Sequence, residues 1–148
     1  MKIAIVNGPN LKYIGKRETN IYGDKSLDDL PSYIAQELNL GREISITTFQ
    51  SNSEGQLIDF LEKLWESKGN GIVINAGAYT HTSIALADCL RWISIPYVEI
   101  HLSNVYARES FRHKSLLAPK ALGVICGFGI YSYVLGVRAL LNYLNEKI

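Results

Sequence analysis

An arginine and a tyrosine, Arg17 and Tyr22, stand five positions apart in a long polar segment near the start of the chain. A free tyrosine has a pKa of about 10 and is a poor base at neutral pH. A nearby guanidinium favours the phenolate and lowers that pKa, so Tyr22 could remove a proton from a carbon atom placed against it. The chain has nine tyrosines, and packing of Tyr22 beneath a loop is the alternative.

A carboxylate and an imidazole, Glu99 and His101, alternate at the end of an apolar run. Alternating positions of a strand point to the same face, so the carboxylate can orient the imidazole for acid–base work or share a metal ion with it. The sequence has no H-E-x-x-H or C-x-x-C spacing to supply further ligands. An oriented acid or base is therefore preferred to a metal site, and a structural salt bridge is the alternative.

Two further arginines, Arg108 and Arg112, are spaced i, i+4 on a predicted short helix after residue 100. One face of that helix would present two guanidiniums, which suits a carboxylate or phosphate ligand. Pairing of the same arginines with Glu109 on a solvated face is an equal alternative. The spacing of Gly8 and Gly15 does not match a phosphate-binding loop.

The elements that must position these residues are short runs rich in Ile and Val, separated by helical patterns. Unbroken apolar runs are typical of parallel strands buried on both faces. Alternating strands and helices predict an α/β domain, and five strands fit a flavodoxin-like three-layer sandwich with a parallel sheet of order 2-1-3-4-5. The predicted strands are 2–7, 44–49, 71–75, 95–100 and 121–126; the helical patterns begin near Leu27, Leu57, Ile84 and Val134.

Polar or glycine-rich segments follow all five predicted strands, and the first of them, residues 7–23, is unusually long. In sheets of this kind, ligands bind beyond the carboxyl ends of the strands. Connections between a strand and a helix usually take about 2–6 residues, and long ordered loops often act as lids. We therefore expect residues 7–23 to form a lid that carries Arg17 and Tyr22 onto a ligand.

Composition places the chain among ordinary globular proteins. Its 148 residues predict a single domain over 1–148, with 47% hydrophobic and 20% charged residues. A formal net charge of +1 argues against nucleic-acid binding, and no signal peptide is visible, so a cytoplasmic location is expected. Cys89 and Cys126 are predicted to be buried thiols without a disulfide. Residues 121–137 are apolar but too short for a membrane span, and we predict a strand, a glycine turn and a helix there.

With these residues assembled, the chain resembles the type II 3-dehydroquinate dehydratases (type II dehydroquinases) over essentially its whole length. The resemblance is carried by several long motifs in the family's order, which together are far more specific than any one of them. The motifs are Asn7-Gly8-Pro9-Asn10-Leu11, Gly15-Lys16-Arg17-Glu18, Tyr22-Gly23, Gln50-Ser51-Asn52-Ser53-Glu54-Gly55, Asn75-Ala76-Gly77-Ala78-Tyr79-Thr80-His81-Thr82-Ser83, Glu99-Ile100-His101-Leu102-Ser103-Asn104 and Arg108-Glu109-x-Phe111-Arg112.

This resemblance implies a trans elimination of water that converts 3-dehydroquinate to 3-dehydroshikimate in the shikimate pathway, without metal, cofactor or covalent imine. Tyr22 would take a proton from C2, with Arg17 holding it as phenolate. Asn10 would stabilise the enolate, through a bound water. His101, oriented by Glu99, would then protonate the departing C1 hydroxyl.

The resemblance also implies binding residues and an assembly. Arg108 would lower the pKa of Tyr22 and help to close the lid. Asp88 would reach into a neighbouring subunit's site, since the family forms trimers that build a homododecamer. No nucleic-acid or membrane partner is expected. The groups expected to hold the substrate are Asn75, His81, Leu102, Ser103 and Arg112.

The chain departs from the family pattern at four positions: Lys12, Tyr13, Thr19 in place of a proline, and Ser132 in place of a glycine. None of the four is expected to touch a residue assigned to chemistry. Two other functions remain as alternatives. One is a flavodoxin-like module that binds a flavin or a phosphoryl group, and the other is an interaction protein with an inactive site.

Overall fold

The computed structural model describes residues 1–14 and 26–146, and its centre is a five-stranded parallel sheet. The strand order is β2-β1-β3-β4-β5, and each neighbouring pair is parallel. The predicted fold class and order are confirmed. The strands are β1 (Lys2–Asn7), β2 (Ser45–Gln50), β3 (Gly71–Asn75), β4 (Tyr97–His101) and β5 (Val124–Cys126).

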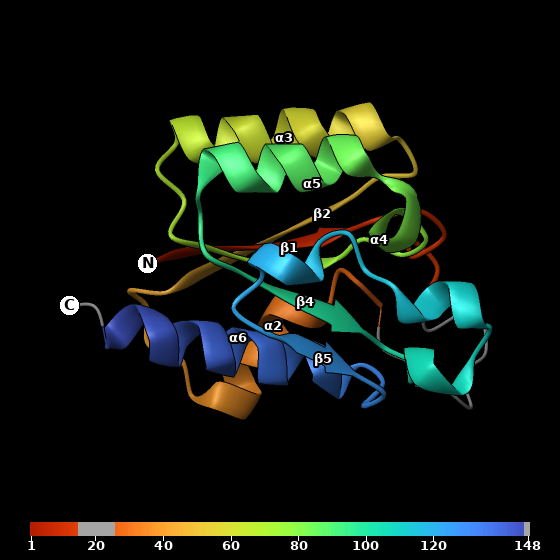
Figure 1. Ribbon diagram of the computed structural model, residues 1–148. Coiled ribbons are helices and arrows are strands. Elements are labelled where there is room, and N and C mark those ends of the chain that lie inside the picture. Colours follow the sequence, from red (N-terminus) through yellow and green to blue (C-terminus); the bar gives the residue numbers. More distant parts are fainter. Residues whose placement is uncertain (15–25, 147–148) are drawn as a thin grey trace.

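Helices cover both faces of this sheet and make three layers (Figure 1). On one face lie α3 (Glu54–Glu66) and α5 (Ile84–Ile93), and on the other lie α2 (Leu30–Leu38) and α6 (Tyr131–Asn145). Shorter elements gather near the ends of the strands. They are α4 (Tyr79–Thr82) and the 3₁₀ helices η1 (Val105–Ala107), η2 (Ser110–His113) and η3 (Ala118–Lys120).

The central strands supply side chains to two separate hydrophobic cores. In β1, Ala4 and Val6 belong to the core beneath α3 and α5, whereas Ile3 and Ile5 belong to the core above α2 and α6. Successive side chains of a strand point to opposite faces, so both sets are buried. This double burial is why the first apolar run is unbroken rather than alternating.

The edge strands differ from this pattern because each has only one neighbouring strand. Residues of β2 are at most half-buried, and Val124 of β5 is 43% exposed. β5 covers only Val124–Cys126 and is shorter than the predicted 121–126. β4 also begins later than predicted, at Tyr97, and β2 lies one residue further along than predicted.

The apolar stretch 121–137 divides as predicted into strand, turn and helix. The turn between β5 and α6 contains Gly127 and Gly129, with φ of 96° and 55°. This backbone region disfavours residues with a Cβ, which explains the glycines. Within residues 1–14 and 26–146, no helix is long and apolar enough to cross a membrane. Cys89 is buried, Cys126 is half-buried rather than buried, and both thiols are free.

The carboxyl ends of β1 and β3 lie so close together that the residue directly after β1, Gly8, must be a glycine. A Cβ on Gly8 would stand 2.2 Å from the carbonyl oxygen of Ala76. Gly8 instead donates its N–H to the carbonyl of Asn75 at 2.8 Å. This approach brings the segment that leaves β1 against the segment that leaves β3.

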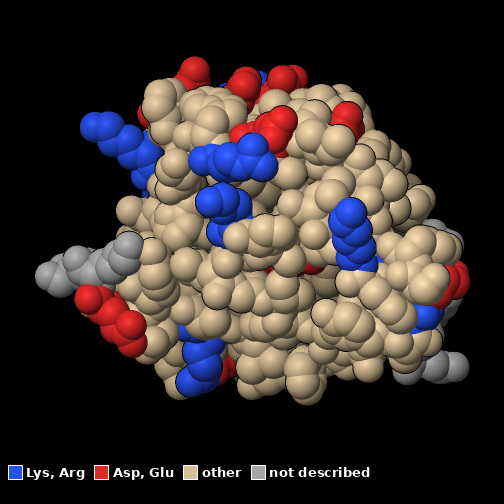
Figure 2. Space-filling model, viewed as in Figure 1, with Lys and Arg blue, Asp and Glu red and all other residues tan. Residues whose placement is uncertain are grey.

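Charged groups of both signs are scattered over the face that Figure 2 shows, and they do not gather into a field of one sign. Most of that face is uncharged, including the surface over β5, whereas basic and acidic side chains lie over α6 and its end. Exposed apolar side chains lie before, within and after β5: Leu122, Val124 and Phe128.

Candidate active site

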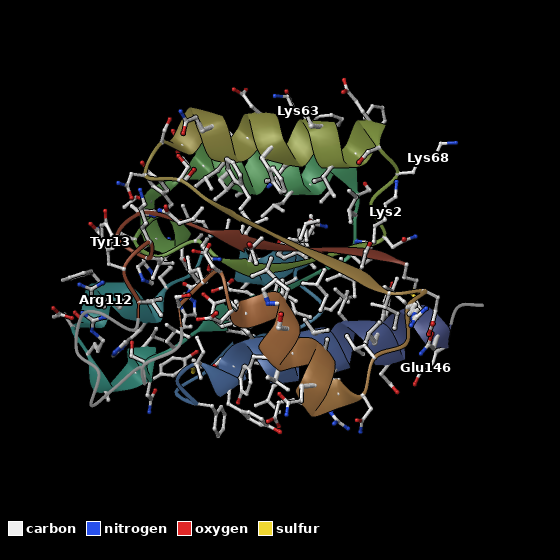
Figure 3. The ribbon with its side chains drawn as sticks, turned by 180° about the vertical axis from the view of Figure 1, so that it is seen from behind. Lys2, Tyr13, Lys63, Lys68, Arg112 and Glu146 are labelled. Atoms are coloured by element: carbon white, nitrogen blue, oxygen red, sulfur yellow. The ribbon has the colours of Figure 1, made fainter. Side chains whose placement is uncertain are left out.

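A cavity of about 340 Å³ lies at the carboxyl edge of the sheet. Figure 3 shows Arg112 and Tyr13 at this end of the molecule and Lys2 and Lys68 at the other. The position agrees with the rule that α/β sheets bind ligands beyond the carboxyl ends of their strands. The cavity is lined by Pro9, Asn10, Leu11, Ile14, Asn75, Gly77, Ala78, His81, His101, Leu102, Ser103, Val105, Arg108 and Arg112.

The end of β4 places an imidazole on a buried carboxylate. Nε2 of His101 lies 2.7 Å from Oε1 of Glu99, and these residues are 7% and 0% exposed. The second carboxylate oxygen, Oε2, accepts a hydrogen bond from the Ser115 hydroxyl at 2.7 Å. The pairing predicted from strand alternation is therefore present. His101 reaches the cavity while Glu99 stays behind it, as an imidazole used for proton transfer requires.

A second imidazole, that of His81 in α4, lies beside the first. The two ring centroids are 6.3 Å apart and the rings are nearly parallel, at 11°. Nδ1 of His81 stands 2.7 Å from the carbonyl oxygen of Lys114. A carbonyl only accepts hydrogen bonds, so Nδ1 carries the proton, and Nε2 of the neutral ring is left to accept one from a ligand.

Asn75, at the end of β3, is held by a buried network that the sequence did not reveal. Its Nδ2 donates to the Tyr133 hydroxyl at 3.3 Å, and its Oδ1 accepts from the Gly77 N–H at 3.3 Å. The Tyr133 hydroxyl in turn donates to Oδ1 of Asn7. Tyr133 is fully buried and burial raises its pKa, so the hydroxyl stays protonated at neutral pH. The network fixes which end of the Asn75 amide carries the nitrogen.

Asn10 lies where the chain leaves β1, in the left-handed conformation with φ of 66°. Its N–H donates to Oδ1 of Asn52 at 3.0 Å, and Gln50 donates to both Asn52 and the carbonyl of Gly8. The hydroxyl of Tyr79 donates to the Asn52 carbonyl at 2.8 Å. The segments that follow β1, β2 and β3 are thus bonded together, and they hold Asn10 at the cavity.

Arg108 and Arg112 both line the cavity, but not as two residues of one helix. Arg112 is in η2, whereas Arg108 lies between η1 and η2 in an extended conformation. The predicted short helix is therefore wrong, because the chain breaks into two 3₁₀ turns here. Nε of Arg112 binds Oε2 of Glu109 at 2.7 Å, and Nε of Arg108 lies 3.7 Å from the same oxygen. The hydrogen bond from Arg112 is the main cause that lowers the pKa of Glu109. Pairing with Glu109, one of the two sequence interpretations, is therefore present, and both arginines also line the cavity.

The remaining predicted site residues lie in three settings. Leu102 and Ser103 line the cavity, and the hydroxyl of Ser103 has no hydrogen-bond partner among the described residues. Asp88 is on α5, outside the cavity lining, where it pairs with Arg91 at 3.0 Å. Arg17 and Tyr22, together with the substituted position Thr19, lie outside the described residues.

One expectation about the unusual positions is wrong. Ser132 was expected not to touch any residue assigned to chemistry, yet its buried hydroxyl donates to the backbone carbonyl of His101 at 3.2 Å. The start of α6 packs against the end of β4, and this contact is tertiary, so no local sequence pattern could show it. Ser132 also lies within the first turn of α6 rather than before the helix.

Ser115 and Tyr133 are the polar residues of this site that sequence reasoning missed. Ser115 follows His113 and Lys114 in a segment without periodicity, and Tyr133 is one of nine tyrosines in an apolar helical pattern. A serine three residues before the start of η3 is a local signal for a side chain that caps backbone N–H groups, but nothing local indicates that it faces Glu99. Within the described part of the chain, no three His, Cys, Asp or Glu side chains are grouped to hold a metal ion.

Comparisons with known proteins identify the family of the chain. The sequence model of the family described as Dehydroquinase class II matches residues 1–141. The 3-dehydroquinate dehydratase of Prochlorococcus marinus (strain NATL1A) is 52% identical, with 99% of each chain covered. That of Rhizobium johnstonii is 54% identical over 95% of each chain. The crystal structure of the type II dehydroquinase from Butyrivibrio crossotus superposes with a TM-score of 0.86 at 42% identity, over 95% of this chain and 97% of that one. The chain belongs to the class II dehydroquinase family.

Proposed function

We propose that this protein is a 3-dehydroquinate dehydratase, a hydro-lyase of the shikimate pathway that eliminates water from 3-dehydroquinate to give 3-dehydroshikimate. The observation that carries the proposal is the buried Glu99–His101 pair at a cavity that two arginines also line. An imidazole on a carboxylate suits proton delivery, and guanidiniums suit a carboxylate substrate. The curated relatives compared above carry the name of the same enzyme.

The first step is removal of a proton from C2 by Tyr22. Arg17 and Arg108 favour the phenolate form of Tyr22 by their charge. The electron pair of the C2–H bond moves into the adjacent carbonyl and forms an enolate. Asn10 is held at the cavity by its backbone bond to Asn52 and stabilises the enolate oxygen, through a bound water. Donors fixed in advance where charge develops are among the largest contributions to catalysis.

The second step is loss of the C1 hydroxyl on the opposite side of the substrate. The enolate electrons return to form the C1–C2 double bond as the C1–O bond breaks. His101 gives its proton to the departing oxygen, which leaves as water, and Glu99 stabilises the imidazolium before the transfer. One proton is taken and one is delivered, so the substrate's charge is unchanged over the whole reaction.

The substrate is held by groups from several strand ends. Arg112 binds its carboxylate, which suits a guanidinium that lines the cavity. Nε2 of His81 accepts a bond from a ring hydroxyl, because Nδ1 is already occupied by the Lys114 carbonyl. Asn75, Leu102 and Ser103 complete the binding set with amide, backbone and hydroxyl groups.

The test is formation of 3-dehydroshikimate from 3-dehydroquinate, followed by the absorbance of its conjugated enone. We expect turnover in the purified protein, loss of turnover in Tyr22→Phe, and no inactivation by borohydride with substrate present. Ser67→Ala is a suitable control, because Ser67 caps the far end of α3 and does not line the cavity. Full activity in Tyr22→Phe would rule out the proposed base, and borohydride inactivation would indicate an imine instead.

We further propose that residues 1–148 form one domain and that the protein acts in the cytoplasm as a homododecamer built from trimers. Asp88 is exposed on α5, where it could meet the cavity of a neighbouring subunit. Analytical ultracentrifugation of the wild type should give the mass of twelve chains. Asp88→Ala should then raise KM and leave the free energy of unfolding nearly unchanged. A stable monomer with full activity would contradict both the assembly and the role of Asp88.

A further inference from the structure

Ser115 contacts the carboxylate of Glu99 on the side away from His101. Its hydroxyl lies 2.7 Å from Oε2, whereas His101 lies 2.7 Å from Oε1. Ser115 does not line the cavity. We propose that Ser115 is a positioning residue, which acts through Glu99 to fix the tautomer and orientation of the His101 imidazole. This inference rests on the proposed function, in which His101 delivers the proton.

The direction of the bond between Ser115 and Glu99 follows from the other partners of the serine. A hydroxyl has one proton to donate and two lone pairs that accept. The backbone N–H groups of Leu117 and Ala118 both donate to the Ser115 oxygen, at 3.1 and 2.9 Å. With its lone pairs occupied, the hydroxyl has its proton left for Glu99.

The constraint passes from Ser115 to the imidazole through the two oxygens of one carboxylate. Oε2 of Glu99 accepts the proton of the Ser115 hydroxyl. The space between these two oxygens is therefore not filled by a proton of the carboxyl group itself. Oε1 then accepts from the Nε2–H of His101. The lone pair of the neutral ring, or the second proton of the imidazolium, is therefore on Nδ1. A fully buried carboxylate needs both donors, because an ionised group without partners is costly to bury.

The backbone around Ser115 is anchored on two sides, which makes it a fixed donor rather than part of a free loop. The N–H of Leu116 donates to the carbonyl of Thr80 at 2.9 Å. The hydroxyl of Tyr97 donates to the carbonyl of Leu117 at 2.5 Å. Burial raises the pKa of Tyr97 to about 12, with the Glu99 charge adding to the effect, so this donor stays protonated. Ser115 is thus tied to α4 and to β4, the strand that carries Glu99 and His101.

A second serine in the chain makes the same two kinds of bond, one to a backbone N–H and one to a carboxylate, without a histidine on that carboxylate. Ser83 accepts the N–H of Leu86 at 2.9 Å and donates to the carboxylate of Glu54. Neither Ser83 nor Glu54 lines the cavity. Replacing Ser83 by alanine removes a helix cap and a serine–glutamate bond, but it removes no constraint on His101. It is therefore the matched control for Ser115.

The experiment compares Ser115→Ala, Ser115→Thr and Ser83→Ala in the full chain. We expect kcat of Ser115→Ala to fall about 10-fold, the low end of the loss seen when the outer partner of a metal-bound histidine is removed, because Glu99 still contacts His101 in this variant. KM should stay within about twofold. Ser115→Thr keeps the hydroxyl and should recover most of kcat. Ser83→Ala should lower the melting temperature and leave kcat unchanged. An unchanged kcat in Ser115→Ala, an equal loss in Ser83→Ala, or no recovery in Ser115→Thr would overturn the proposal.

A second measurement separates this inference from the proposed function. Nitrogen-15 NMR of the His101 side chain reports which ring nitrogen carries the proton, with or without turnover. We expect one tautomer, protonated at Nε2, in the wild type and in Ser83→Ala, and a mixture in Ser115→Ala. If the wild type fails to dehydrate 3-dehydroquinate but Ser115→Ala still shows the mixture of His101 tautomers, the proposed function alone is contradicted. Identical His101 spectra in all the variants contradict the role of Ser115 alone.

Discussion

Two largely buried polar clusters lie beneath the cavity, and they differ in the kind of group at their centre. The histidine cluster consists of Glu99, His101 and Ser115, and the asparagine cluster consists of Asn7, Asn75 and Tyr133. Each ends in one side chain that lines the cavity, which is His101 in the first and Asn75 in the second.

The clusters also differ in how completely their atoms are paired. Both carboxylate oxygens of Glu99 have donors, whereas Nδ2 of Asn7 has no hydrogen-bond partner within residues 1–14 and 26–146. A buried charge without partners costs far more than a buried amide without one. We therefore propose that the histidine cluster holds a charge and moves a proton. The asparagine cluster is built to hold a neutral amide in place, so the two should respond differently to mutation.

Among the residues that support His101 and Asn75 in these clusters, the largest effect is expected from Glu99→Gln. Ser115 has a proton to donate, so the amide oxygen of the new side chain should face Ser115. The NH₂ group would then face His101 and force its Nε2 to accept, which reverses the tautomer and destabilises the imidazolium. We expect kcat to fall about 100-fold, the low end of what general acid catalysis contributes, as measured by the enone assay. A loss expressed only in KM would instead assign Glu99 to substrate binding.

A smaller effect, on binding rather than on turnover, is expected from Asn75→Ala. The cavity would lose one amide that holds the substrate, and a hydrogen bond of this kind contributes about 1–1.5 kcal/mol. KM should therefore rise about tenfold while kcat changes less. Steady-state kinetics check this prediction, and a fall in kcat as large as that of Glu99→Gln would show that the two clusters do not have separate roles.

Tyr133→Phe should affect stability more than catalysis. The variant leaves Oδ1 of Asn7 and Nδ2 of Asn75 without their buried partner, at a cost of about 1–3 kcal/mol in the free energy of unfolding. We expect kcat to change by less than about threefold, because no proton passes through this cluster. Urea unfolding measures the stability, and an unchanged unfolding midpoint would mean that a water replaces the hydroxyl.

The smallest effect concerns alkaline pH. Burial raises the folded-state pKa of Tyr133 above the ordinary value of 10.0. The folded state then binds the proton more tightly than the unfolded state does, so this stabilisation is complete below pH 10.0 and is lost as pH rises further. Tyr133→Phe should show a shallower fall in stability above that pH than the wild type. Parallel curves for the two proteins would indicate that the hydroxyl is not buried.

The sequence predicted the parts of this structure that depend on local pattern. Unbroken Ile and Val runs indicated buried parallel strands, and the alternation of Glu99 and His101 indicated their pairing. It failed where the chain is irregular, as at Arg108, where two 3₁₀ turns replace the expected helix.

Contacts between distant residues were also beyond a sequence pattern. Ser115 is 16 positions from Glu99, and Tyr133 is 126 positions from Asn7. These bonds depend on how α6 and the segment before η3 pack on the sheet, which periodicity does not specify. The same reason explains why the contact of Ser132 with the His101 carbonyl was not foreseen.

We propose that His101 acts only in the second step, after Tyr22 has formed the enolate. The most direct test is to incubate His101→Ala with 3-dehydroquinate in D₂O and to follow C2 deuteration by proton NMR and the enone by absorbance. Deuteration at C2 should continue, while formation of the enone should fall by about 10²–10⁴. Loss of both together, or an enone rate within about tenfold of the wild type, would contradict the account.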